Sequence, residues 1–471
     1  MPRIMSLLSA VAALLCTVAA VSFSAQAPRG AKPHAINDVD RGRAFDHFDR
    51  LLPLALDSAN EAAAKQVRDA LTEAKSPWLT IAAVEAVRQA EVDKPGTGKV
   101  FLPEVLALMG EEHAKLHEEE IVLVNVMACL GVLVKADDKD NVTAAVQALV
   151  DWQKRTKNEI VRLRHMAERV LFTLTGEDCT LREDTVAFWE WWLKNQAAKV
   201  AEKAPEKAPE KKSKTAPVVF REPIVGTRIV FVIDVSDSMK HPIDPKDIDQ
   251  LKAKAPHLPW DKKREPTALW LATQELAHSI SQLKPEDPKK AGGKGTKRPK
   301  NDPELRYFAI VTYSKDIKLV TDGWVEASEK NCRVWSDHAR DLETETLTNI
   351  HGGLMQAFGL SAARSNTSSP ELDRDCVLTG AHTIVFLTDG YPTWSEDSSD
   401  MSGTNEFKHA VGNGEYVKRD KLIELAVRTN RFRKVMINTV GIGSHDKELM
   451  KALAKNAGGA YTDWSCKILW E

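Results

Sequence analysis

Apolar residues in the second half of the chain fall into short, nearly continuous runs and longer segments with helical spacing. Residues 228–233 and 382–387 are apolar runs rich in β-branched and aromatic side chains, which is typical of strands buried on both faces. We interpret residues 267–283, 419–431 and 447–456 as helices. Strands that alternate with helices predict an α/β fold with a doubly wound, mainly parallel, Rossmann-like sheet.

Three more strands are expected in the same half of the chain. They cover residues 305–313, 435–440 and 460–464, and a Gly-Gly pair at 458–459 ends the helix before the last of them. With these elements, the α/β domain is expected to occupy residues 225–471.

The first half of the chain has a helical pattern instead. Residues 121–134 are apolar enough for a buried helix, and a second helix has its apolar positions on one face at Val142, Ala145, Val146, Leu149 and Val150. Successive helices with short polar breaks predict an all-α solenoid domain over residues 40–197. Residues 198–224 contain a repeated charged unit with proline and little to bury, which predicts a solvated linker.

The first 27 residues have the three parts of a secretory signal peptide. Arg3 precedes an apolar run over residues 4–23, and small residues follow at 24–27. This order predicts export, so the protein is expected to be secreted, periplasmic or held in the cell envelope. The apolar run approaches the ~20 residues that span a bilayer, so an uncleaved segment is the alternative that would attach the chain to a membrane.

A carboxylate and two hydroxyls follow the first predicted strand directly. They belong to Asp234, Ser236 and Ser238. Ligands of open α/β sheets bind at the carboxyl ends of the strands, and closely spaced oxygen ligands suit a hard divalent cation. The alternative is that these are ordinary turn and capping residues.

Two distant segments favour the metal site. Asp389 follows the strand at 382–387 within Thr388-Asp389-Gly390, so its carboxylate is expected at the same edge of the sheet. Thr348 lies just ahead of a helix that is expected to begin near Ile350. Three separate segments thus place oxygen ligands where one cation could reach them.

These segments, in this order, resemble the von Willebrand factor type A (VWA) family and its metal-ion-dependent adhesion site (MIDAS). The resemblance covers about residues 225–466. It implies that Ser236, Ser238 and Thr348 offer hydroxyl oxygens, while Asp234 and Asp389 act directly or through water. The implied cofactor is a divalent cation, first Mg²⁺, with Mn²⁺ and Ca²⁺ as alternatives, and the implied partner is a protein whose Asp or Glu completes the metal shell.

The helical half carries a resemblance of its own. Its last part contains Leu174-Thr175-Gly176-Glu177-Asp178, followed by the aromatic cluster Phe188-Trp189-Glu190-Trp191-Trp192. This ending resembles that of HEAT-like repeat domains in some bacterial envelope proteins. The resemblance implies a second interaction surface, in which the aromatic residues form core and capping surface.

Three features depart from the VWA pattern. Asp237 adds a negative charge between the two serines. Residues 239–266 form a Pro-rich insertion that leaves from the metal edge; it is a candidate specificity loop, with a disordered surface excursion as the alternative. Few residues follow the last strand, so the terminal helix of the family is expected to be short or missing.

The cysteines leave the redox chemistry open. Cys332 and Cys376 could form a bridge within the α/β domain, or they could be buried thiols. The chain has no Cys-x-x-Cys pair, so structural zinc is not expected.

Composition and motifs argue against two classes of function. A formal net charge of -2 gives no reason to expect nucleic-acid binding. The chain has no His-Glu-x-x-His, Gly-x-Ser-x-Gly or phosphate-loop motif, so we expect no catalytic residues and no enzyme activity. The favoured hypothesis is a protein-binding module that uses a divalent cation. The alternative is a structural scaffold in which the helical domain binds and the VWA domain is a metal-stabilised or metal-free assembly element.

Overall fold

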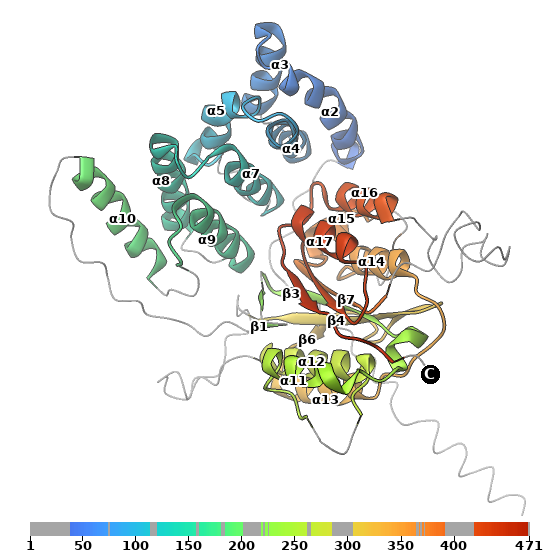
Figure 1. The fold of residues 1–471 in the computed structure, drawn as a ribbon. Coiled ribbons are helices and arrows are strands. Elements are labelled where there is room, and N and C mark those ends of the chain that lie inside the picture. The colour runs from blue at the N-terminus through green and yellow to red at the C-terminus, as the bar shows by residue number, and fades with distance from the viewer. Residues whose placement is uncertain are drawn as a thin grey trace, which may run out of the picture.

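The computed structural model contains a helical region followed by an α/β region (Figure 1). It describes residues 38–73, 76–113, 120–156, 160–179, 184–200, 218–219, 222–224, 226–260, 265–284, 305–363, 367, 370–371, 373–390 and 419–469. The predicted signal peptide at 1–27 lies outside these residues. None of the described helices has the length and hydropathy needed to span a bilayer.

The helical region is built around one apolar core. Its helices are α2 (Asp38–Leu56), α3 (Glu61–Thr72), α4 (Pro77–Asp93), α5 (Leu102–Ala107), α7 (Glu120–Leu133), α8 (Lys139–Thr156), α9 (Val161–Thr175) and α10 (Thr185–Val200). The apolar face predicted from Val142 to Val150 is buried on α8, and Trp152 joins the same core. The helical content is as predicted, whereas the HEAT-like repeat arrangement stays a prediction.

The final part of the predicted linker contains regular structure. Residues Val218–Val219 (β1) and Glu222–Pro223 (β2) pair as a two-stranded antiparallel sheet. Most of the remaining linker, residues 201–217, lies outside the described residues.

The α/β region contains a seven-stranded sheet. Its strands are β3 (Arg228–Asp234), β4 (Tyr307–Tyr313), β5 (Ile317–Leu319), β6 (Val325–Glu326), β7 (Thr383–Thr388), β8 (Met436–Ile442) and β9 (Tyr461–Trp464). Strands β4, β3, β7, β8 and β9 lie side by side in this order and run parallel, while β5 and β6 pair with β4 in the antiparallel sense. The prediction of a mainly parallel sheet is confirmed.

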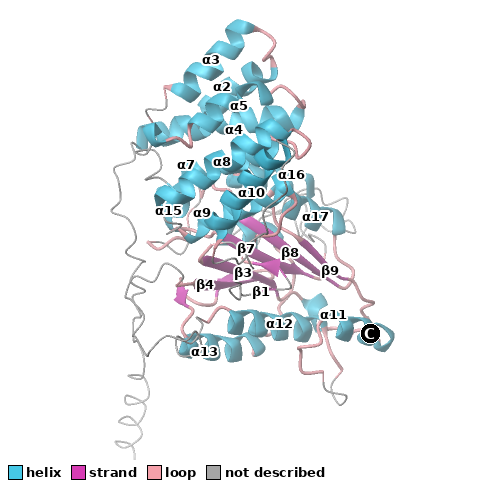
Figure 2. Ribbon diagram, turned by 90° about the vertical axis from the view of Figure 1, so that its left-hand side faces the viewer, coloured by secondary structure: helices cyan, strands magenta, loops and turns pink. Residues whose placement is uncertain are grey.

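Helices cover both faces of this sheet (Figure 2). They are α11 (Pro245–Lys254), α12 (Ala268–Gln282), α13 (Glu329–Arg340), α14 (Ile350–Gly359), α15 (Arg374–Thr379), α16 (Arg419–Asn430) and α17 (Lys447–Asn456). Side chains of β3 alternate between the two cores: Phe231 packs with the layer that contains α12, and Val232 with the layer that contains α14. Burial on both faces explains why β3 and β7 are apolar without interruption.

The Pro-rich insertion is part of the folded α/β region. It contains α11, and Leu251, Ala255 and Leu258 are buried in the same core as α12. The alternative of a disordered excursion is therefore wrong for the described part of the insertion, because its apolar side chains have a core to enter.

The described segment after β9 pairs with the start of the Pro-rich insertion and forms no helix. Ile468 pairs with Ile243 in an isolated antiparallel bridge, and the amide of Asp244 donates to the carbonyl of Lys467 at 2.8 Å. The end of the described chain is thus held against the beginning of the insertion.

The cysteines settle one open alternative. Cys332 and Cys376 are both free thiols, and both are buried. Cys332 lies in the core with α12, whereas the thiol of Cys376 donates to the carbonyl of Gly359 at 3.3 Å. The possible bridge between them is therefore not formed. Burial raises the pKa of both thiols, to about 11 and about 12, which favours the protonated, less reactive form.

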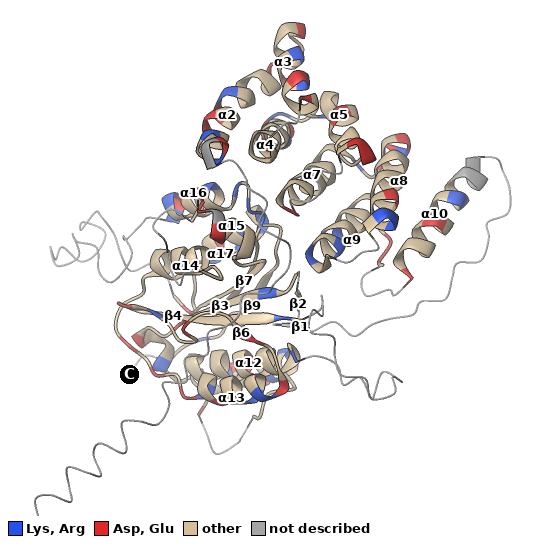
Figure 3. Cartoon of the chain, turned by 180° about the vertical axis from the view of Figure 1, so that it is seen from behind, with Lys and Arg blue, Asp and Glu red and all other residues tan. Residues whose placement is uncertain are grey.

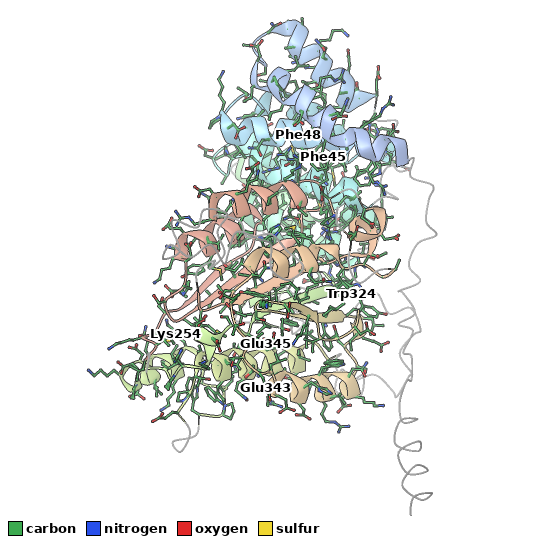
Figure 4. All side chains as sticks on the ribbon, turned by 90° about the vertical axis from the view of Figure 1, so that its right-hand side faces the viewer. Phe45, Phe48, Lys254, Trp324, Glu343 and Glu345 are labelled. Carbon is green, nitrogen blue, oxygen red and sulfur yellow. The ribbon has the colours of Figure 1, made fainter. Side chains whose placement is uncertain are left out.

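The helical region packs against the amino-terminal edge of the sheet. The side-chain amide of Asn125 donates to the carbonyl of Phe432, just before β8, at 2.7 Å. The rings of Phe45 and Phe432 lie 4.7 Å apart, and the guanidinium of Arg431 lies 4.0 Å from the ring centre of Phe48. Figure 4 labels Phe45 and Phe48 where α2 meets the α/β region. The two regions therefore share a packed junction.

Candidate functional site

The strand order places the candidate site at a reversal of the sheet. If the parallel strands are numbered along the chain, their order in the sheet is 2-1-3-4-5, because β4 lies on one side of β3 and β7 on the other. In sheets of this order the crevice for ligands opens at the carboxyl ends of the first and third strands. Those strands here are β3 and β7, which end at Asp234 and Thr388.

Asp234 is held by three donors at the end of β3. Its side chain is fully buried, and Oδ1 accepts the backbone N–H of Ser236 at 2.8 Å. Oδ2 accepts hydroxyl hydrogen bonds from Thr388 at 2.7 Å and from Tyr313 at 3.3 Å. These bonds fix the orientation of the carboxylate.

Four of the five predicted site residues form one connected group. The hydroxyls of Ser236 and Ser238 lie 2.9 Å apart, and the Ser238 hydroxyl donates to Oδ1 of Asp389 at 2.7 Å. Asp389 is 5% exposed, directly after β7. Two strand ends that are more than 150 residues apart in sequence thus bring their oxygens together, as the sequence predicted.

Thr348 lies on the third segment, where the sequence placed it. It is 4% exposed and is followed by Asn349, which caps α14 by accepting the N–H of Gly352 at 2.8 Å. The loop runs beside the site, since the amide of Glu345, labelled in Figure 4, donates to the carbonyl of Val235 at 2.6 Å. No hydrogen bond within the described part of the chain joins Thr348 to the other four residues.

Neither carboxyl of the site, Asp234 or Asp389, has a cationic side chain as a main influence among the described residues. Burial, followed by the nearby charge of Asp234, raises the pKa of Asp389 to about 8. Burial also raises the pKa of Asp234, against the hydrogen bonds from Ser236 and Thr388. Two buried carboxyls of this kind favour a bound positive charge.

The donor set fits a hard divalent cation. Carboxylate and hydroxyl oxygens are the ligands that Mg²⁺ and Ca²⁺ prefer. Among the described residues, no three His, Cys, Asp or Glu side chains gather into a metal cluster. Ser236, Ser238, Asp234 and Asp389 could hold such an ion, and Thr348 lies on the adjacent loop.

Two residues that orient Asp234 were not identified from the sequence. Thr388 and Tyr313 orient Asp234, and the only available signal was that each hydroxyl lies at or near the end of a predicted strand. Asp237, expected to add charge to the site, forms an exposed ion pair with Lys240 at 3.1 Å. Its negative charge is therefore partly compensated outside the carboxylate pair.

Of three comparisons with known proteins, the one with solved structures finds matches. No family model matches the sequence, and no curated protein matches it. A von Willebrand factor type A structure from Catenulispora acidiphila is 14% identical, covers 50% of this chain and 38% of its own, and has a TM-score of 0.29. The BatB protein of Bacteroides thetaiotaomicron is 12% identical, covers 51% of this chain and 91% of its own, and has a TM-score of 0.28.

A third similar structure belongs to a membrane protein. It is an aerotolerance-related membrane protein from Bacteroides fragilis, which is 13% identical, covers 50% of this chain and 91% of its own, and has a TM-score of 0.25. These structure neighbours are VWA-type domains that match about half of the chain. At 12–14% identity, these structures show a likeness of fold alone.

Proposed function

We propose that this chain is an exported protein-binding module that holds a divalent cation at the ends of β3 and β7. The observation that carries the proposal is the buried group of Asp234, Ser236, Ser238 and Asp389, joined by hydrogen bonds at the reversal of the sheet. When bound, the cation would supply an open coordination position for an Asp or Glu of a partner protein.

The residues around the site have separate roles in this proposal. Thr388 and Tyr313 hold the Asp234 carboxylate in place, so that little side-chain entropy is lost when the ion binds. Ser236 and Ser238 offer neutral oxygens, which leave the charge of the ion available to an incoming carboxylate. The resemblance of the sequence motifs to the VWA family and the predicted signal peptide support the same function.

Metal binding is tested first, by calorimetric titration of the full chain with Mg²⁺ and with Mn²⁺. We expect saturable binding to the wild type and a loss of at least tenfold in affinity for Ser238→Ala. Ser336→Ala is the matched control, because this buried serine donates to the carbonyl of Ala277 at 2.9 Å, within the α12–α13 layer. Its affinity should equal that of the wild type. Absence of saturable binding to the wild type would refute the metal site.

Partner capture is tested next, with the immobilised chain and an envelope extract. Proteins retained in Mg²⁺ should be lost in EDTA and should not be retained by Ser238→Ala. Each retained protein should then lose binding when one exposed Asp or Glu is changed to Asn or Gln. Capture that persists in EDTA would assign the binding to the helical region, which is the scaffold alternative.

A further inference from the structure

A cavity of about 310 Å³ lies at the junction of the two regions. Its walls come from α4, α7 and α9 on one side and from α16, β8 and α17 on the other. Figures 1 and 3 show these helices on either side of the junction. Met436 and Ile437 line it at the start of β8, so it opens at the edge of the sheet opposite to Asp234 and Asp389. The cavity is thus separate from the proposed metal site.

One part of the cavity wall is apolar. Val132, Met166 and Val170 contribute from the helical region, and Met436 and Leu453 from the α/β region. Small-molecule sites are typically ~300–1,000 Å³, with mostly apolar walls and a few placed polar groups. The volume here therefore suits a small ligand with an apolar body.

The charged part of the wall is strongly basic. Five cations line the cavity, Arg88, Arg169, Arg431, Lys434 and Lys455, and the one carboxylate among the residues that line it is that of Glu85. Arg431 also pairs at 4.0 Å with Asp49, which does not line the cavity. Figure 3 shows basic residues on α9 and α16, which flank the junction. This imbalance is unusual for a partly enclosed space, because like charges repel most strongly where water is excluded.

Glu85 neutralises only part of this charge. Its carboxylate accepts from Arg88 at 2.7 and 2.9 Å and from Lys434 at 2.7 Å. Two cations therefore share one carboxylate, which leaves one positive charge in a largely buried group, since Lys434 is 14% and Arg88 21% exposed. An additional anion in the cavity would balance it.

One of the hydrogen-bond acceptors of Arg169 is weak, and an anionic ligand would be a stronger one. Its Nη1 donates to the thioether sulfur of Met436 at 3.0 Å, and its Nη2 donates to the carbonyl of Gly458. A thioether is a weak acceptor, whereas a carboxylate forms a charge-assisted bond with a guanidinium that is about twice as strong as a neutral one. A carboxylate that replaced the sulfur would leave the alkyl part of Met436 against the ligand.

We propose that this cavity binds a small amphipathic carboxylate, with its anionic head among Arg169, Arg88 and Lys434 and its apolar body against Met166, Val170 and Leu453. Charge, volume and wall chemistry point to the same ligand class. Because the ligand would contact both regions, its binding would also hold the junction together.

Gly131 offers a variant that closes the cavity without disturbing the charges. It lines the cavity within α7, and a Cβ added there would lie 3.7 Å from Cγ2 of Val170, an ordinary contact. Gly131→Ala should therefore fit, while the longer side chain of Gly131→Leu extends into the open space. Comparison of these two variants separates the effect of losing a helical glycine from the effect of filling the cavity.

The test is a calorimetric titration of the full chain with octanoate, below its micellar concentration. We expect saturable binding of octanoate, at least tenfold weaker binding of 1-octanol, and no detectable binding of acetate. Gly131→Leu should weaken octanoate binding at least tenfold, whereas Gly131→Ala should change it less than threefold. Arg169→Gln should also weaken it, and it serves as the second variant if Gly131→Leu does not fold.

Three results would each overturn the proposal. The first is an absence of octanoate binding to the wild type at millimolar concentration. The second is binding that is unchanged in folded Gly131→Leu and in Arg169→Gln, which would place the ligand elsewhere. The third is 1-octanol binding as tightly as octanoate, since the basic wall would then contribute nothing.

Discussion

Replacement of Glu85 by Gln should destabilise the folded chain by about 3 kcal/mol. The Glu85 carboxylate is 3% exposed and holds the guanidinium of Arg88 and the ammonium of Lys434, which belongs to the other region. The amide of Gln has nearly the same shape but no charge. Lys434 and Arg88 would then remain buried next to each other without an anion, and an uncompensated buried charge is strongly destabilising.

Two independent comparisons give the size of this loss in unfolding free energy. Removing one partner of a buried pair typically costs ~3–5 kcal/mol. Burial by itself raises the pKa of Glu85, but the charges of Lys434 and Arg88 outweigh burial and bring it from 4.5 down to about 2. That difference corresponds to about 3 kcal/mol, which agrees with the lower end of the first range. Burial and Arg88 also lower the pKa of Lys434 to about 8, so its ammonium depends on Glu85.

The contribution of Glu85 to the stability of the fold depends on pH. The pKa of Glu85 is lower in the folded state, so its stabilising contribution is complete above its unfolded value of 4.5. The contribution is lost as the pH falls from there toward 2. The difference in unfolding free energy between wild type and Glu85→Gln should therefore shrink as the pH falls below about 4.5.

The assay is urea unfolding followed by circular dichroism, with Glu91→Gln as the matched control. Glu91 lies on the same helix and is also buried, with 3% of the whole residue exposed against 2% for Glu85. Its Oε2 accepts the amides of Gly96 and Lys99, at 2.9 and 3.0 Å, and among the described residues it forms no ion pair. Gln can accept both bonds, so this variant should lose only about 1 kcal/mol. The double variant Glu85→Gln/Lys434→Met should recover stability relative to Glu85→Gln. Equal losses in Glu85→Gln and Glu91→Gln would refute the reasoning.

Three further substitutions test how the α/β region is built. Thr267→Ala removes the hydroxyl that accepts the Trp270 amide at 3.0 Å and caps α12, so thermal unfolding should show a loss of about 1 kcal/mol. Tyr313→Phe removes the hydroxyl that donates to Asp234 and to Leu387, and urea unfolding should show a loss of about 1–3 kcal/mol. Gly459→Ala would place a Cβ 2.0 Å from the carbonyl oxygen of Ile437. Thermal unfolding should therefore show a loss of about 1–3 kcal/mol or more. A melting temperature equal to that of the wild type would contradict this contact.

The sequence by itself determined the local elements and the chemistry that they carry. The apolar runs that became β3 and β7, and the oxygens that follow them, can be read directly because strand burial and strand ends leave a local pattern. The helix that became α12 was placed within one residue at each end, since its apolar spacing and the capping Thr267 are also local signals.

The tertiary structure alone decided which of these elements meet. The strand order that sets β3 beside β7, and so brings Ser238 to Asp389, depends on pairing between segments more than 150 residues apart. The hydroxyls that orient Asp234 and the junction of Glu85 with Lys434 also join residues that are far apart in sequence. Periodicity reports which face of an element is buried, but it contains no information about the neighbour that buries it, and for that reason the cavity at the junction was visible only in the fold.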